Sequence, residues 1–389
     1  MKKIIHGVIL SAVLLCSLYA QEGTGPEMAE AVRGYYRVFS QRGWADADTL
    51  ARELEQRFNE FNRLFHFDKQ RLRSPLVVRA FEDREIYNAY VSTRLGKTRD
   101  GAVYLHYNQP DRRELVILRG SPEEPWMLAH QAFIQFFRAF IPSPPAWMQE
   151  GFAIYFNTLG FDRTTDKLTY EENLSWLDEV KTLGQATPPL ESILLADIRG
   201  IPDHFQGLSW ALVSFLLNSG NPDYFRALIE SFILLSDSAS AAINSETVMK
   251  RITLWTGANT LQNDYQTYLV GRKTFRELID EGQRAYEAKD YIGAEQSFLT
   301  AIDQRPSHYA SYYYLGLLAY EEKKYDRAEG YYRSALQYGA DQALVQYARG
   351  LNAAAQGHNA EAINFLQEAA RLSPPRYKER VENLISGLR

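Results

Sequence analysis

A repeat of 34 residues in the last third of the chain constrains its fold more than any other feature. Glycine recurs at this spacing, and so do two small positions and one bulky position: Gly282, Gly316 and Gly350; Ala294, Ala328 and Ala362; Ala301, Ala335 and Ala369; Phe298, Tyr332 and Leu366. A fixed period of this length is typical of stacked helix pairs, with small residues where two helices touch. We therefore expect an all-α solenoid in this region.

The period and its small residues resemble the tetratricopeptide repeat family. Pro306 and Pro374 match the family's closing proline, whereas Ala340 departs from it in the middle repeat. The resemblance implies three repeats over residues 275–374, which is about the minimum for a stable stack. Residues 375–389 are expected to add a cap helix, because four apolar residues share one helical stripe: Tyr377, Val381, Leu384 and Leu388.

If the repeats stack in the usual way, the inner face of the array is aromatic and nearly uncharged. Eight residues are predicted to line this groove: Ile279, Gln283, Tyr286, Tyr313, Leu317, Tyr320, Tyr347 and Leu351. Repeat domains that hold a C-terminal carboxylate use lysines and asparagines at such positions, and these are absent here. The groove is expected to bind an apolar or aromatic segment of a protein or peptide partner. The alternative is that this face packs on the chain's own first domain.

Two apolar helical runs lie in the middle of the chain, at residues 126–140 and 146–157. The segment between them, Ile141-Pro142-Ser143-Pro144-Pro145, cannot continue a helix, because proline lacks an N–H and clashes with the preceding turn. The two runs therefore predict a helix hairpin. Taken alone, its His130 and Glu150 are consistent with a hydrogen-bonded core histidine and a carboxylate near a helix N-terminus.

The hairpin resembles the gluzincin metallopeptidases, in particular the peptidase-MA-like group. In that family H-E-x-x-H supplies two zinc ligands and a general base, and a later W-x-x-E-G-x-A segment supplies the third ligand. The later segment is present as residues 147–153, but the first reads His130-Gln131-Ala132-Phe133-Ile134. Only His130 and Glu150 correspond to ligand residues, and Gln131 occupies the position of the base.

These departures argue against hydrolysis at this site. A catalytic zinc needs three protein ligands and an open water position, and a glutamine cannot accept a proton from that water. No cofactor is therefore expected. An active zinc metallopeptidase with an unorthodox site remains the alternative, with His204 either replacing the lost ligand or steadying the transition state.

The segments before the hairpin predict a small sheet. Residues 76–81, 102–107 and 114–118 have the composition of strands, and turn residues separate them. Helical spacing is seen in Glu27–Arg42 and Asp46–Phe65 before these strands. After the hairpin, helices are expected at 207–217, 222–235 and 245–270. Residues 21–272 thus predict a degenerate gluzincin-like α+β domain, mostly helical, ahead of the solenoid.

The first 20 residues predict an export signal, with a charged start, an apolar middle and a small residue, Ala20, before the cut. The only cysteine, Cys16, lies inside it, and Leu15 before it is not the small residue that lipidation would require. Loss of Lys2 and Lys3 would leave 41 basic against 48 acidic residues.

The charge pattern and the signal together suggest where the protein acts and on what. No basic run supports nucleic-acid binding, and no transmembrane segment is expected in the mature chain. We expect an exported, periplasmic or envelope-associated protein that binds or scaffolds other proteins. A structural subunit of an envelope assembly is a further alternative.

Overall fold

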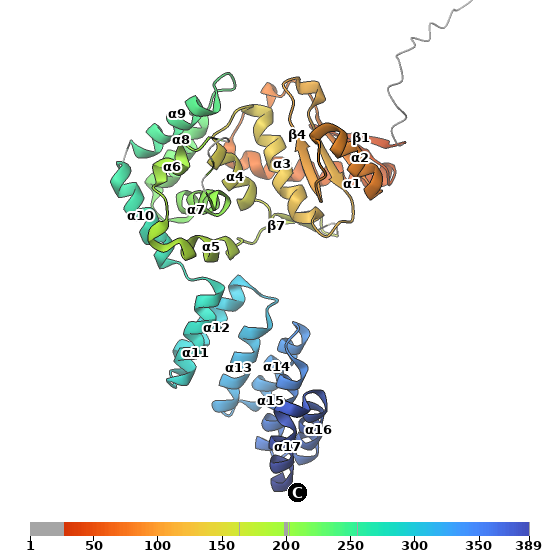
Figure 1. Cartoon of the computed structure of the whole chain (residues 1–389), viewed down its shortest axis with the longest axis vertical. Helices are drawn as coiled ribbons and strands as arrows, with labels where there is room; N and C mark the ends of the chain where they lie inside the picture. Colours follow the sequence, from red (N-terminus) through yellow and green to blue (C-terminus); the bar gives the residue numbers. More distant parts are fainter. Residues whose placement is uncertain (1–26, 163, 198–200, 202, 255, 389) are drawn as a thin grey trace, which may run out of the picture.

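A computed structural model describes residues 27–162, 164–197, 201, 203–254 and 256–388. They form a mixed domain with a small sheet, followed by an array of paired helices (Figure 1). The signal prediction for residues 1–20, including Cys16, falls outside the described residues. Among the residues that the structure describes, no helix combines the length and the apolar character needed to cross a membrane.

The sheet has five strands in the order β1-β2-β3-β5-β4. Strands β2, β3 and β5 are parallel, and the two edge strands pair antiparallel with their neighbours. Their bounds are Ala29–Arg33 for β1, Tyr36–Ser40 for β2, Leu76–Phe81 for β3, Ala102–Leu105 for β4 and Glu114–Leu118 for β5.

The helical interpretation of Glu27–Arg42 is wrong, because this segment forms the β1–β2 hairpin. Tyr36, Val38 and Ser40 are fully buried while their neighbours are not, which is the period of two expected for a strand. Gly34 has a φ of 53° in the connecting turn, a left-handed conformation that glycine adopts without strain.

Helices cover both faces of the sheet. Along β5, Leu115 and Ile117 face the main core, where α1 (Trp44–Phe65) and α3 (Glu124–Phe140) pack on β1 to β5. Val116 and Leu118 face a smaller core with α2 (Arg84–Leu95). Because side chains alternate along a strand, β5 contributes residues to the apolar cores on both faces of the sheet.

The predicted helix hairpin is confirmed as α3 and α4 (Ala146–Tyr155), and helices fill the remainder of the domain. The single helix expected over residues 245–270 is instead two helices, because Gly257 breaks it with a φ of 75°. The elements after α4 are β6 (Gly160–Asp162), β7 (Lys167–Thr169), α5 (Ser175–Leu183), α6 (Leu190–Leu194), α7 (Phe205–Asn218), α8 (Pro222–Leu234), α9 (Ala241–Thr253) and α10 (Ala258–Gly271), with 3₁₀ turns at Lys69–Arg71, Pro110–Arg112 and Gly184–Ala186.

The C-terminal array consists of three helix pairs and a last helix, as expected from the repeat. A β-carbon on Gly316 would lie 2.4 Å from the ring of Tyr332, which is the bulky residue of the same repeat. The recurring glycine therefore lets the two helices of a pair approach closely. The pairs are α11 (Phe275–Glu287) with α12 (Tyr291–Gln304), α13 (Tyr309–Glu321) with α14 (Tyr325–Gln337), and α15 (Gln342–Ala355) with α16 (Asn359–Leu372), followed by α17 (Pro374–Leu388).

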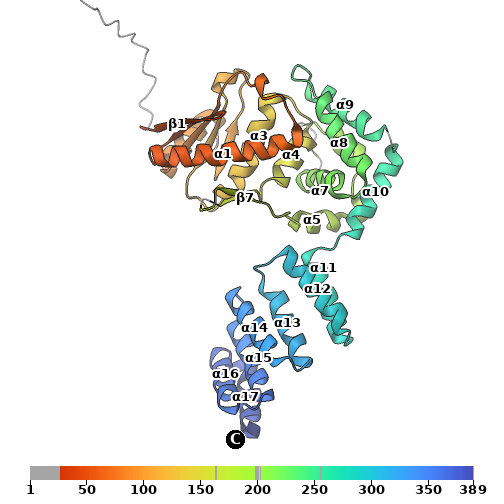
Figure 2. The ribbon, with the colours of Figure 1, turned by 180° about the vertical axis from the view of Figure 1, so that it is seen from behind.

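The array is joined to the first domain at its first helix. Thr274 and Glu277 form a reciprocal capping box at the start of α11, and Lys181 of α5 donates to the same Glu277 carboxylate at 2.8 Å. Arg305 lies 3.8 Å from Asp178 of α5. Helices α13 to α17 extend away from the first domain in both opposite views (Figures 1 and 2).

Candidate functional site

The helix hairpin brings His130 of α3 and Glu150 of α4 together. The His130 Nε2 atom lies 3.3 Å from Glu150 Oε1, and the histidine is buried. Gly151 allows this placement, because a β-carbon there would lie 2.4 Å from the Ser209 carbonyl oxygen of α7. Helix α4 can therefore pack directly on α7, with Glu150 at their border.

Gln131 links His130 to the edge of the sheet. Its Oε1 atom accepts a hydrogen bond from the backbone N–H of Tyr104 on β4 at 2.9 Å. This contact fixes the orientation of the amide, so Nε2 faces His130 Nδ1 at 3.1 Å and donates to it. The neutral imidazole consequently carries its proton on Nε2.

With that tautomer, His130 Nε2–H donates to Glu150, and Gln206 Nε2 donates to the same Oε1 atom at 2.8 Å. Burial alone would raise the pKa of Glu150, but the hydrogen bonds from His130 Nε2–H and from Gln206 lower it overall. The result is a closed chain of hydrogen bonds from the sheet edge through Gln131 and His130 to an ionised carboxylate.

The residues at this position do not fit a catalytic zinc site. A histidine ligand offers a nitrogen lone pair, whereas His130 Nε2 is engaged as a donor to Glu150. Ile134 belongs to the core, and His204 pairs through Nδ1 with Glu179 Oε1 at 2.9 Å. Within the described residues, no group of three or more histidine, cysteine, aspartate or glutamate side chains is arranged to hold a metal ion.

His204 and Glu150 line one open cavity of about 760 Å³, together with residues of α3, α4, α5, the start of α7 and the described part of the α6–α7 connection. His204 itself has a left-handed φ of 58° directly before α7, and its side chain is 45% exposed. Of the three predicted ligand-type residues, Glu150 and His204 thus line the same cavity, but the His204 side chain is hydrogen-bonded to Glu179.

Sequence reasoning did not identify Gln206 or the structural role of Gln131. The contact from Gln206 to Glu150 spans 56 positions, and that from Gln131 to Tyr104 spans 27. The sequence identifies Gln131 only as the residue at the position of the general base, where it cannot accept a proton. No local pattern indicates that its amide pairs with a strand edge.

The inner helices of the array lie next to one another, with α13 between α11 and α15. Of the eight predicted groove residues, Ile279 is 9% exposed: it packs in the core of the first repeat and also lines a cavity next to α5. The other seven are half-buried along these three helices: Gln283, Tyr286, Tyr313, Leu317, Tyr320, Tyr347 and Leu351.

The sequence model of the tetratricopeptide repeat family matches residues 279–343 and, in a second match, residues 324–377. The C-terminal region contains tetratricopeptide repeats. No curated protein matches the chain. The two matched ranges cover most of the array and include each of the repeating glycines.

Four of the seven half-buried residues on the inner face of the tetratricopeptide repeats are tyrosines, and contacts with neighbours hold residues of this face in place. Gln283 Nε2 donates to the Tyr314 hydroxyl at 2.6 Å, and Tyr347 stacks on Tyr377 of α17 at 4.8 Å between ring centroids. Helix α15 and the C-terminal part of α13 extend away from the first domain in both views (Figures 1 and 2), whereas Ile279 of α11 and Ala310 at the start of α13 line a cavity with residues of α5. The first domain thus borders this face at its α11 end, and the α15 end points away from that domain.

Proposed function

We propose that the protein is a binding or scaffolding protein whose tetratricopeptide repeats hold a segment of a protein partner. The observation that carries this proposal is the match to the repeat family together with the tyrosine-rich inner face of α11, α13 and α15. Stacked repeats bury their cores between helices and present an extended surface to partners. Half-buried tyrosines supply large contact areas at low entropic cost and keep a hydroxyl for hydrogen bonding.

The proposed occupant is an extended segment with apolar and aromatic side chains. Leu317, Leu351 and four of the tyrosines offer mainly carbon surface, and Glu321 at the rim accepts from the Tyr286 hydroxyl at 3.4 Å. A segment with basic residues beside its apolar anchors would complement this rim.

The first domain is proposed to be a degenerate gluzincin-like domain that has no peptidase activity. The order of the elements supports it, since a sheet precedes a hairpin that carries His130 and Glu150 in the corresponding positions. The hydrogen-bonded state of His130 Nε2 supports the absence of hydrolysis. Descent from an enzyme fold does not by itself imply activity.

We further propose that the protein is exported and acts in the periplasm or cell envelope. The charged and then apolar segment up to Ala20 supports this location. Mass spectrometry of the exported protein should find a mature chain that begins at Gln21. A mature mass carrying acyl chains on Cys16 would show lipidation instead.

The binding proposal is tested by selecting peptides from a displayed random library on the full-length protein, followed by fluorescence anisotropy of a selected peptide. Tyr320→Ala and Tyr347→Ala should each weaken binding about tenfold, because each removes an aromatic anchor. Ile292→Ala is the matched control, since this side chain is 83% exposed on α12, outside the inner face. Selected peptides that bind both tyrosine variants as tightly as the wild type would contradict the proposal.

A further inference from the structure

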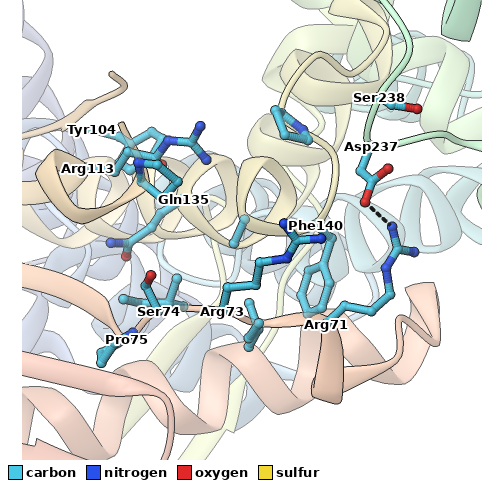
Figure 3. A pocket seen from close by; sticks show the side chains of 15 residues that line it. Arg71, Arg73, Ser74, Pro75, Tyr104, Arg113, Gln135, Phe140, Asp237 and Ser238 are labelled. Atoms are coloured by element: carbon cyan, nitrogen blue, oxygen red, sulfur yellow. Dashed lines mark hydrogen bonds and ion pairs between the residues drawn. The ribbon is translucent and has the colours of Figure 1, made fainter. Parts of the chain in front are cut away.

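A second cavity, of about 360 Å³, lies on the first domain and shares no lining residue with the cavity beside Glu150. It is formed by the approach to β3, the C-terminal half of α3, the β4–β5 connection and the α8–α9 connection (Figure 3). Gln135 of α3 is 1% exposed and donates to the Val77 carbonyl of β3 at 2.9 Å, which fixes one wall to the sheet.

The charge of this cavity is unbalanced. Arg71, Arg73 and Arg113 line it, and Asp237 is the one acidic residue among its described lining. Asp237 is already paired with Arg71 at 3.0 Å, as the dashed line in Figure 3 shows. Two positive charges therefore have no carboxylate in a protein with 48 acidic and 43 basic residues.

Neither of the two remaining arginines is satisfied by an acid elsewhere in the described chain. Arg113 is half-buried and donates to two backbone carbonyl oxygens, those of Tyr107 at 2.7 Å and Asn108 at 3.5 Å. Arg73 makes no hydrogen bond or ion pair with a described residue, and Figure 3 shows its guanidinium beside Phe140. A positive pocket of this kind favours an anion, and guanidinium groups match the geometry of carboxylates.

A further arginine, Arg138, lines the cavity beside Glu150 and donates to Gln149 Oε1 at 2.5 Å. Burial lowers the pKa of Arg138, and the charge of Arg113 lowers it further against the opposing effect of Tyr104. His106 responds to the same field: burial first, then Arg138 and Arg113, lower its pKa to about 4. The surroundings thus disfavour further positive charge and favour a bound negative one.

The other walls of the cavity are apolar and stiff. They include Leu72, Pro75, Pro110, Phe140 and Pro142. An inorganic anion would contact the arginines but leave the apolar side chains uncovered. A ligand that carries both an anionic group and an apolar group would contact the arginines and the apolar side chains together. The volume lies near the lower end of the roughly 300–1,000 Å³ of small-ligand sites.

We propose that this cavity binds the free C-terminal carboxylate of a peptide whose last residue is apolar. Arg73 and Arg113 hold the carboxylate, and the last side chain packs against Leu72 and Phe140. This site is independent of the partner groove on the repeats, so either can exist without the other.

Calorimetric titration of the full-length protein tests the site with three probes: an N-acetylated tripeptide ending in leucine, the same tripeptide as its C-terminal amide, and inorganic phosphate. The free acid should bind at least tenfold more tightly than the amide, because only the ionised carboxylate can make charge-assisted hydrogen bonds with the two arginines. Phosphate should bind more weakly than the acid. Arg73→Gln, which removes no hydrogen bond or ion pair with a described residue, and Arg113→Gln should each weaken binding of the acid about tenfold.

Arg84→Gln is the matched control, because Arg84 pairs with Asp100 at 3.1 Å outside the cavity. Binding of the free acid should also raise the pKa of His106 in a proton NMR titration, since the carboxylate offsets the arginine charges, and the amide should leave it unchanged. Equal binding of acid and amide would overturn the proposal. So would affinity for the acid that survives in both cavity variants, or phosphate binding that is tighter than that of the acid and is lost in the same variants.

Discussion

The backbone N–H of Tyr104 on edge strand β4 donates a hydrogen bond to the side-chain carbonyl of Gln131 on α3, at 2.9 Å. The other end of the same amide donates to His130. The position that resembles the general base of a peptidase is therefore a connection between the sheet edge and a buried histidine. Its amide matters because one end accepts and the other donates.

Gln131→Leu should destabilise the protein by about 1–3 kcal/mol, because the Tyr104 N–H and His130 Nδ1 would both lose their partner. Urea unfolding monitored by circular dichroism measures this change. Gln367→Leu replaces an exposed glutamine on α16 and should stay within about 0.5 kcal/mol of the wild type. Equal stability of the two variants would show that the Gln131 contacts contribute nothing.

The double variant Gln131→Glu with Ile134→His should bind zinc more tightly than the wild type. The glutamate would accept from both Tyr104 N–H and His130 Nδ1–H, which frees the Nε2 lone pair for a metal. The new histidine lies four residues after His130 on the same helical face. Zinc titration by calorimetry compares the proteins, and tight one-to-one binding by the wild type that His130→Ala removes would contradict this account.

Gly151→Ala should destabilise the first domain by about 1–3 kcal/mol, since the new β-carbon would lie 2.4 Å from a backbone oxygen of α7 that cannot move aside. Gly330→Ala is the matched control, because a β-carbon there meets nothing within 4 Å in the middle of α14. That variant should gain about 0.5–1 kcal/mol. Thermal unfolding of both proteins decides the matter, and a stable Gly151→Ala protein would show that α4 and α7 can separate at little cost.

The stability of the protein should fall as the pH is lowered from 6.5 towards 4. His106 has a pKa of about 4 in the folded state, owing to burial and then to Arg138 and Arg113, against about 6.5 when unfolded. The unfolded state therefore binds a proton in this range that the folded state does not, and stability is lost as the pH falls. Glu150, whose pKa is lowered, adds a further loss below about 4.5.

Melting temperatures between pH 7.5 and pH 4 test this expectation. His106→Gln should flatten the curve between pH 6.5 and 4, whereas His358→Gln, with a side chain that is 59% exposed, should follow the wild type. An unchanged slope in His106→Gln would mean that another group controls the acid sensitivity.

Removal of residues 376–389 should lower the melting temperature of the repeats. Tyr377, Val381 and Ile385 of α17 share an apolar cluster with Leu366 of the last repeat, so the truncation exposes that residue. Circular dichroism of the full-length and truncated proteins measures the shift. A truncated protein that melts no earlier would show that α17 does not stabilise the array.

Sequence periodicity by itself determined the array and the helix hairpin. The repeated glycine predicts the helix pairing, because a residue of normal size cannot fit where Phe298, Tyr332 or Leu366 contacts it. The prolines after residue 141 likewise end α3, because proline cannot continue a helix whatever the helix packs against. These features depend on neighbours within one turn or one repeat, so a local pattern suffices to predict them.

Only the tertiary structure decided the β1–β2 hairpin, the state of His130 and the arginine cavity. Residues 29–40 form strands because β2 pairs in parallel with β3, as Tyr36 does with Leu76, 40 positions further along the chain. Likewise, Gln206 reaches Glu150 across 56 positions, and Asp237 pairs with Arg71 across 166. Contacts between residues this far apart have no local period, so they depend on how the packed elements bring side chains together.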